Sequence, residues 1–356
     1  MRGEPFLNLV LTVGLVLMVG WLLFIGRPIL LPIMMAIISV YVLVTAAEAL
    51  GGMPVIGRLS SFARHAIVLL GFTLAIVALA LVISITAADL VVAAPRYQSN
   101  LENLASRLAD DGWVEAHPTW DDIRDATLGK INLQATLIRF LGGLTSVGFT
   151  VFLVVVYAGF LMAERDTFPA KLAAAFPRGA QAEITERIVR DVNAKIGDYL
   201  AVKTLINIIL GVISFAILKF MGVDFALFWA VIIGLFNYIP YVGSIIGVAL
   251  PVVLSIAQFG SLGTTALLGA LLIAAQTYVG NILEPRMIGR QLNLSPFVVM
   301  VSLALWSALW GLPGAILAIP MTSMLAIILA SFPSTRFLAV LLSGSVEDYA
   351  ADQAPH

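Results

Sequence analysis

The segment Phe225–Phe259, FALFWAVIIGLFNYIPYVGSIIGVALPVVLSIAQF, decides the fold class of this 356-residue chain. It contains no Asp, Glu, Lys or Arg, and it is longer than the roughly 20 residues that a helix needs to cross a bilayer once. Asn237, Pro240 and Gly243 interrupt it near the middle. The segment therefore predicts a membrane-embedded helix that breaks and folds back on itself.

The composition supports this class for the whole chain. Hydrophobic residues make up 60% and charged residues 12% of the sequence, and the mean hydropathy is +1.02. We predict an all-α polytopic integral membrane protein with about eight membrane segments, two Pro/Gly-broken helical hairpins and small extramembrane amphipathic helices. The formal net charge of -1 and the absence of cysteine give no case for nucleic acid or thiolate chemistry, and no cofactor or metal is expected.

Hydropathy divides the chain into alternating membrane and polar segments. The predicted boundaries are 1–94 for the first three membrane helices, 95–139 for an extracytoplasmic helical element, 140–163 for the fourth membrane helix, 164–199 for cytoplasmic amphipathic helices, 200–335 for a C-terminal membrane region and 336–356 for a cytoplasmic tail. The C-terminal membrane region contains both predicted hairpins, 225–259 and 297–331.

The second predicted hairpin resembles the first one weakly. Its breaking residues are Gly311, Pro313 and Gly314, and each hairpin has a Trp before its break and a Pro after it. Pairs of Gly/Pro-interrupted apolar segments are typical of the discontinuous helices of secondary transporters. We predict that Pro240 and Gly243 in the first hairpin, and these three residues in the second, are hinge or break positions.

Lysine and arginine residues indicate the orientation. If both hairpins return to their own side, one side holds twelve of these residues: Arg2, Arg58, Arg64, Arg165, Lys171, Arg178, Arg187, Arg190, Lys195, Arg286, Arg290 and Arg336. The other side holds seven: Arg27, Arg96, Arg107, Arg124, Lys130, Arg139 and Lys219. The bias predicts a multi-pass protein with both termini in the cytoplasm.

Lys203, Asn207 and Gly211 follow one another at intervals of four residues, so they share one helix face that we expect to point into the protein. Lys203 either lies at the cytoplasmic interface, extended toward water or paired with a helix end, or contacts the solute or an ion. Asn207 adds an amide to the same face.

Asn237, Pro240 and Gly243 place unpaired polar backbone groups at membrane depth, which requires a cavity or a partner. Helix ends at this break could bind a polar solute. Alternatively, the Pro and Gly only permit a tight re-entrant turn.

Thr277, Asn281 and Glu284 share another helix face, and Pro285 marks the expected end of that helix. A carboxylate at this position could carry a proton or hold a cation. It could equally form a fixed ion pair with Lys203, Arg286 or Arg290.

A mechanism can be predicted from these positions. We expect the two hairpins to meet near mid-membrane, with Asn237, Pro240, Gly243, Asn281 and Gly314 around a polar pocket. Asn237→Ala and Gly243→Leu are then expected to abolish transport while leaving the protein folded.

Other classes of function were weighed against transport. The chain has three His residues and no HExxH or GxSxG motif, which argues against an intramembrane hydrolase. A non-transporting membrane scaffold or regulator would not need a polar cavity at mid-membrane. A passive channel is the nearer alternative to a carrier, although broken hairpins favour alternating access.

The region 199–320 resembles the autoinducer-2 exporter family of bacterial permeases. The resemblance rests on Tyr199-Leu200, Lys203, Asn207, Gly211, Gly222-Val223-Asp224, Trp229, the run from Phe236 to Gly243, Asn281, Glu284-Pro285, Gly289, Leu294-Ser295-Pro296, Trp310-Gly311, Gly314 and Ile319-Pro320. It implies about eight membrane segments in a bacterial inner membrane, and export of a small signalling molecule in one branch of the family. It also implies sodium or proton antiport in other branches, and a homo-oligomer, with a pentamer as the expected form.

Overall fold

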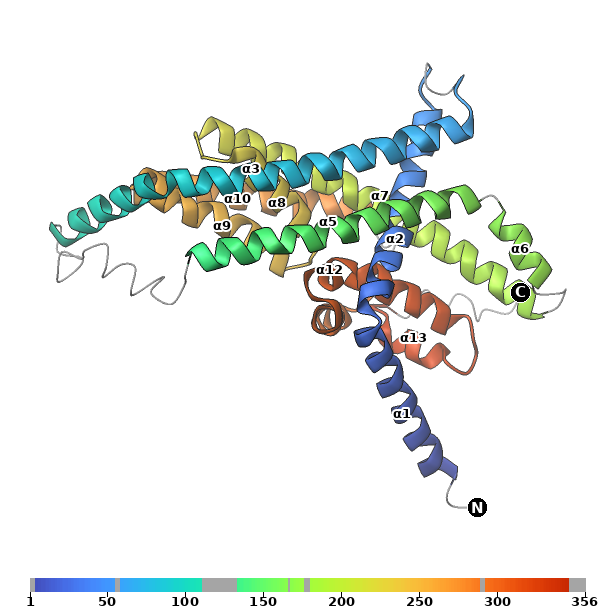
Figure 1. Ribbon diagram of the computed structural model, residues 1–356. Coiled ribbons are helices and arrows are strands. Elements are labelled where there is room, and N and C mark those ends of the chain that lie inside the picture. The colour runs from blue at the N-terminus through green and yellow to red at the C-terminus, as the bar shows by residue number, and fades with distance from the viewer. Residues whose placement is uncertain are drawn as a thin grey trace. The chain divides into compact units, whose positions relative to one another are not determined.

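The chain is described here from a computed structural model, which describes residues 4–54, 58–110, 133–165, 167–175, 180–288 and 292–345. These residues form helices and turns, and no strand occurs among them (Figure 1). The helices are α1 Glu4–Ile25, α2 Arg27–Gly51, α3 Ser61–Asp110, α5 Leu133–Glu164, α6 Phe168–Ala175, α7 Ala180–Phe220, α8 Ala226–Phe236, α9 Val242–Phe259, α10 Leu262–Tyr278, the π-helix η2 Val279–Leu283, α11 Glu284–Ile288, α12 Pro296–Ala330 and α13 Arg336–Leu342.

Six helices in the described part are long and apolar enough to cross a membrane. They are Arg27–Gly51, Ser61–Leu90, Ile184–Phe220, Val242–Phe259, Leu262–Ile288 and Pro296–Ala330. Three shorter apolar helices accompany them: Val10–Ile25, Gly148–Glu164 and Ala226–Phe236. The all-helical, multi-pass class is thus confirmed, and the number of about eight membrane segments stays a prediction.

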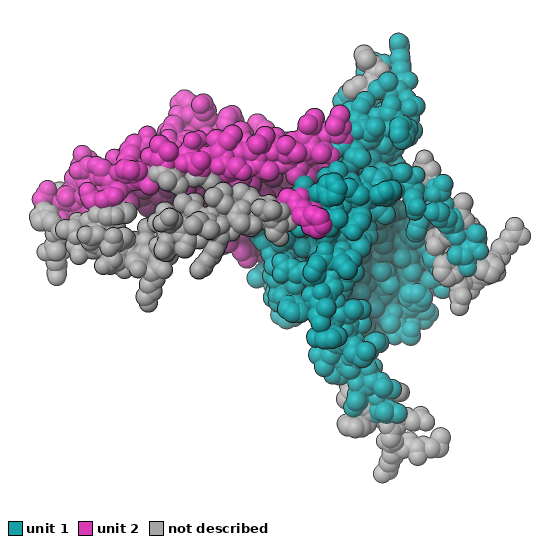
Figure 2. All heavy atoms as spheres, viewed as in Figure 1, with its two compact units in different colours: residues 1–69, 150–201, 290–356 teal, residues 70–149, 202–289 magenta. Residues whose placement is uncertain are grey.

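The chain divides into two compact units (Figure 2). Unit 1 comprises 1–69, 150–201 and 290–356, and unit 2 comprises 70–149 and 202–289. Unit 2 therefore contains α3 from residue 70 onward, most of the membrane part of α7 and all of α8 to α11, whereas α12 and α13 belong to unit 1.

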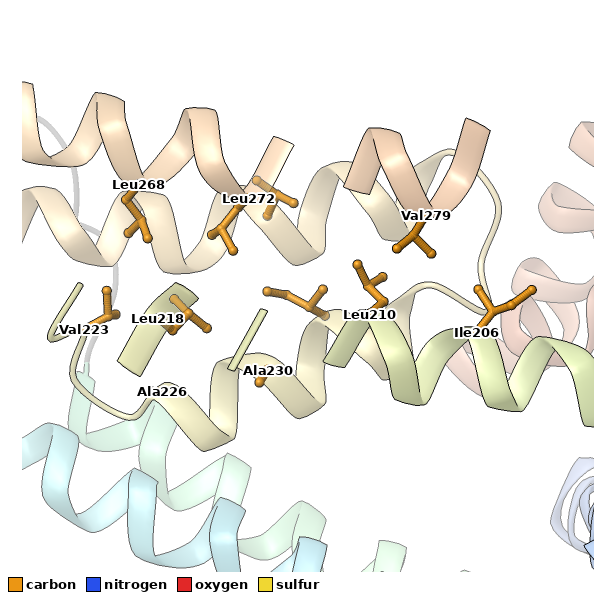
Figure 3. Packing of buried hydrophobic residues seen from close by; sticks show 11 residues of the cluster. Ile206, Leu210, Leu218, Val223, Ala226, Ala230, Leu268, Leu272 and Val279 are labelled. Carbon is orange, nitrogen blue, oxygen red and sulfur yellow. The ribbon is translucent and has the colours of Figure 1, made fainter. Parts of the chain in front are cut away.

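Unit 2 has a continuous apolar core. Figure 3 shows side chains from α7, α8, α10 and η2 that converge on one cluster, among them Ile206, Leu210, Leu268, Leu272 and Val279. These five residues are all 1% exposed or less. Their burial fixes the helices on which the polar residues of the site are carried.

The first predicted break lies between α8 and α9. The helix ends at Phe236, Asn237 caps it, and Tyr241 has the left-handed φ of 60°. Pro240 lies inside this turn, where its missing N–H disrupts no helical hydrogen bond. A Cβ at Gly243 would lie 1.7 Å from the Phe236 carbonyl oxygen, so only glycine fits. This contact contradicts the expectation that Gly243→Leu would leave the fold intact.

The second predicted break lies in α12. Gly311 has φ 68° and ψ -146°, and Trp306 Nε1 donates to Thr322 Oγ1 at 3.1 Å. These two residues would be about 24 Å apart along a continuous helix, so α12 folds back as a hairpin. A Cβ at Gly314 would lie 2.0 Å from the Trp306 carbonyl oxygen. Pro313 lies between the two glycines, where the second half of the hairpin begins and a missing N–H is tolerated.

Several helices run through predicted boundaries. α7 is one helix across the boundary at 199/200, and α3 continues through Pro95 to Asp110. In both cases helical periodicity continues across the change from apolar to amphipathic sequence, so these boundaries mark a change of composition within one helix. The remainder of the element predicted at 95–139 lies outside the described residues up to 132, and α5 begins at Leu133.

Pro285 does not end its helix, contrary to the prediction. The π-helix η2 precedes it, and the backbone N–H of Glu284 bonds to the Val279 carbonyl. The wider π turn shifts the hydrogen-bond register ahead of the proline, and the chain continues as α11. The predicted tail also contains a helix, α13, which sequence reasoning missed.

Candidate functional site

The polar face predicted on α7 points into the protein. Lys203 is 3% and Asn207 is 5% exposed, and a Cβ at Gly211 would lie 3.5 Å from the Ala230 carbonyl oxygen. The three residues are thus brought against neighbouring helices of unit 2. Buried amides and ammonium groups require partners, and each of the two polar side chains has one.

Asn207 begins a chain of hydrogen-bonded amides. Asn237 Nδ2 donates to Asn207 Oδ1 at 2.8 Å, and Gln276 Nε2 donates to Asn237 Oδ1 at 2.8 Å. The chain connects α7, the break after α8, and α10. Hydrogen bonds in such a series polarise one another in a low-dielectric environment, so the three amides form a single polar element inside an apolar unit.

The amide chain has an unused acceptor. Gln276 Oε1 is buried and has no hydrogen-bond partner among the described residues. An unmade hydrogen bond at a buried polar atom costs about 1–3 kcal/mol. Such an atom is available to a donor group on a bound solute or to water.

A pair of hydroxyl groups lies beside the amide chain. Thr204 Oγ1 and Tyr238 Oη are 2.7 Å apart, and the Tyr238 hydroxyl also interacts with the Asn207 side chain. Sequence reasoning missed both hydroxyl residues. Helical spacing could have found Thr204, which lies three residues before Asn207 and seven before Gly211 on the same helix face. Tyr238 follows Asn237 in the quoted break.

Lys203 forms an ion pair with Glu284. Lys203 Nζ lies 2.6 Å from Glu284 Oε1, and the two side chains are 4% and 27% exposed. Lys203 is one of the three ion-pair partners predicted for Glu284. Arg290 lies outside the described residues. The pair lies one residue from Thr204 along α7, so the charged and amide groups occupy the same part of unit 2.

The remaining predicted site residues belong to other elements. Asn281 is in η2 and is exposed, outside the chain of amides. Gly311, Pro313 and Gly314 lie at the break of α12, in unit 1. The structure therefore brings together Lys203, Asn207, Asn237 and Glu284 with the break at Pro240 and Gly243.

A second polar cluster, which sequence reasoning missed, joins distant segments of unit 2. Asp224 accepts hydrogen bonds from Arg96 and from Tyr97, the latter at 2.8 Å. Asn100 Nδ2 donates to the Gln258 carbonyl at 2.6 Å, and Gln258 Oε1 accepts from the Asp224 backbone N–H at 2.8 Å. Burial, together with the hydrogen bond to Asp224, raises the pKa of Tyr97 to about 12. The cluster connects α3 to the turn before α8 and to the end of α9.

The orientation predicted from charge assigns Arg96 to the outer side. Its contact with Asp224 requires that the α7–α8 turn lie on that same side of the membrane. Lys219 was also assigned to the outer side and closes α7 just before this turn. The predicted topology is therefore internally consistent in unit 2.

The chain is similar to known proteins. A model of the AI-2E family transporters matches residues 11–334. The "AI-2 transport protein TqsA" of Escherichia coli K12 is 31% identical over 243 residues, which cover 68% of this chain and 67% of that protein.

Two further relatives carry similar names. The "Putative transport protein" of Borreliella burgdorferi is 33% identical over 231 residues, 63% of each chain. The "Putative transport protein YhhT" of Escherichia coli K12 is 41% identical over 147 residues, 41% of this chain and 42% of that protein. The chain thus matches less than two thirds of the length of both of these relatives.

Proposed function

The chain belongs to the AI-2E transporter family, and from that premise we propose that it exports a small polar solute, such as autoinducer-2, by alternating access. Members of this family are transport proteins and not enzymes. The expectation of a multi-pass membrane transporter without catalytic activity is therefore confirmed. The solute, the direction and the mechanism are our proposal.

The observation that carries the proposal is the amide chain Asn207–Asn237–Gln276. It lies at a helix break in an otherwise apolar unit, which is where discontinuous helices of transporters bind solutes. Amides offer both donors and acceptors, so they suit an uncharged, hydroxyl-bearing solute. The printed name of the relative TqsA supports autoinducer-2 as the first solute to test.

The test compares solutes inside and outside cells. Cells that lack the protein, cells that express it, and cells that express the Asn207→Ala variant are grown in parallel, and the metabolites of medium and cytoplasm are quantified. We expect at least one polar solute, with autoinducer-2 the first candidate, to accumulate in the medium only with the wild-type protein. Identical metabolite profiles in all three cultures would refute export.

A second candidate is a sodium- or proton-coupled antiporter, and the Lys203–Glu284 pair favours it. A buried ion pair is costly to form and is sensitive to the loss of one charge. Protonation of Glu284 would release Lys203 next to the hydroxyl pair. Transport by purified protein in liposomes should then respond to an imposed pH gradient, and Glu284→Gln should remove that response. A sodium gradient that alone drives transport would assign the coupling to sodium.

Orientation and assembly belong to the same proposal. We place the protein in the bacterial inner membrane with both termini in the cytoplasm, as a homo-oligomer with a pentamer expected. Since wild type contains no cysteine, single-cysteine labelling is clean. Ser106→Cys should react from outside intact cells, while Gln181→Cys and Ser345→Cys should not. Native mass spectrometry that finds only monomers would contradict the oligomer.

A further inference from the structure

An open groove lies between α7 and α8 in unit 2. One end of the groove meets the amide chain. Its volume is about 400 Å³. The floor is formed by small residues that let the two backbones approach. A Cβ at Gly234 would lie 2.9 Å from the Asn207 carbonyl oxygen, and one at Gly211 would lie 3.5 Å from that of Ala230.

The groove changes in polarity along its length. At one end it is lined by Thr204, Asn207 and Tyr238, and at the other by Phe215 and Leu227. The residues between these ends are aliphatic or glycine. The groove therefore has the polarity of an amphiphile, with a polar part at one end and a hydrocarbon part beyond it.

Its length matches one leaflet. The helix rise gives roughly 16 Å from Thr204 to Phe215, which is about half of the ~30 Å hydrocarbon core of a bilayer. The polar end lies next to Lys203, close to where the apolar part of α7 begins. The groove thus begins near the membrane interface at its polar end and extends along α7 past the middle of the span, toward the α7–α8 turn.

We propose that this groove binds one acyl chain of a bilayer phospholipid, from the leaflet on the side where α7 begins. The ester region of the lipid lies at Thr204 and Tyr238, and the chain runs along Gly211 toward Phe215. An apolar groove does not hold water, and leaving it empty would forfeit the dispersion contacts of its lining. The open side is hydrocarbon-facing in character, since Ile208 and Val212 are 57% and 63% exposed.

The proposal goes beyond the solute site, although the two share a wall. Asn207 belongs to the amide chain and lines the groove. A bound acyl chain would exclude water from that side of the amides. Lipid binding and solute transport can nevertheless be measured separately, so failure of one does not decide the other.

Photo-crosslinking tests the proposal directly. The full-length protein is reconstituted into vesicles of phosphatidylethanolamine and phosphatidylglycerol with a small fraction of a phosphatidylcholine that bears a diazirine on its acyl chain. After illumination, lipid adducts are mapped on peptides by mass spectrometry. We expect adducts to concentrate on the groove residues of α7 and α8.

Groove-filling variants supply the control. Val212 lines the groove and Val253 in α9 does not, yet both are 63% exposed. Val212→Trp should reduce the groove adducts to background, whereas Val253→Trp should leave them at the wild-type level. Val231→Phe fills the groove from α8 and should act like Val212→Trp, which keeps the test valid if one variant fails to fold.

Three results would overturn the proposal. Adducts could be spread over all exposed helix faces without preference for the groove, or the yield could be unchanged in both filled variants. Alternatively, a second copy could occupy the groove. Val212→Cys protein would then form disulfide-linked subunit pairs, and wild-type groove adducts would be absent.

Discussion

The breaks in the two interrupted helices share a packing device but differ in the side chains that surround them. In each, a glycine lies against the backbone carbonyl of an aromatic residue: Gly243 against Phe236, and Gly314 against Trp306. The α8–α9 break carries a buried amide that joins two other helices. The α12 break has a Trp–Thr hydrogen bond within the hairpin, and Trp310 Nε1, next to Gly311, donates to the Leu23 backbone carbonyl in α1 at 3.0 Å.

This difference separates architecture from chemistry. The glycine contact is needed wherever a helix folds back so tightly, whatever the protein does. At the first break, amide side chains make the hydrogen bonds to other helices, whereas at the second break the Trp310 indole donates to the backbone of α1. The α8–α9 break thus has the polar side chains that the proposed solute site needs. The hydrogen bonds at the α12 break stabilise its hairpin.

The largest effects are expected from the shared device. Gly243→Ala and Gly314→Ala each place a Cβ within 2.0 Å of a backbone oxygen, so the backbone must move. Overpacking costs about 1–3 kcal/mol even where side chains can adjust, and here we expect loss of the folded protein. Size-exclusion chromatography and thermal unfolding in detergent measure this.

Gly263→Ala in α10 is the matched control, because a Cβ there meets no atom within 4 Å. It should elute and unfold like wild type. If Gly243→Ala and Gly314→Ala behave like this control, the shared glycine device is not what shapes the breaks.

A smaller effect is expected at the hydrogen bond of the second break. Thr322→Val leaves the buried Trp306 Nε1 without its acceptor, which should destabilise the protein by about 1–3 kcal/mol. The transport rate per folded molecule should not change, because this bond stabilises the hairpin and does not bind solute. A loss of transport without a loss of stability would place the α12 break in the solute path, and the two breaks would then not differ in function.

The features of these breaks that depend on local sequence could be predicted, and those that depend on contacts between distant segments could not. Asn237, Pro240 and Gly243, and likewise Gly311 and Gly314, are recognisable because helix-breaking residues stand out in apolar runs. The burial of Lys203 and Asn207 follows from their common helix face. These are local properties of the chain.

Interactions between distant segments could not be predicted in the same way. The choice of Asn207 and Gln276 as partners for Asn237, and the contact of Arg96 with Asp224, depend on how separate helices pack. The spacing of residues contains no such information. The passage of the helix through Pro285 was misjudged because proline signals a boundary only on average.

The smallest effect is expected at Ser323. Its hydroxyl is 3% exposed and has no hydrogen-bond partner within the described part of the chain. Removing an unpaired buried hydroxyl in Ser323→Ala should change stability by less than about 1 kcal/mol, with transport unchanged. If this substitution slows transport, the hydroxyl contacts solute or ion, and the second break also has a chemical role.

The amide chain at the first break is the proposed binding site of the solute. Wild-type and Asn237→Ala proteins are purified and reconstituted at equal amounts of folded protein into liposomes loaded with autoinducer-2. Asn237 supplies both a donor and an acceptor to this chain. Loss of about 1.4 kcal/mol or more of binding free energy corresponds to at least a tenfold weaker affinity. At autoinducer-2 concentrations below Kd, the predicted result is an efflux slower by about the same factor. Efflux from Asn237→Ala liposomes at the wild-type rate would show that the amide chain does not bind the solute.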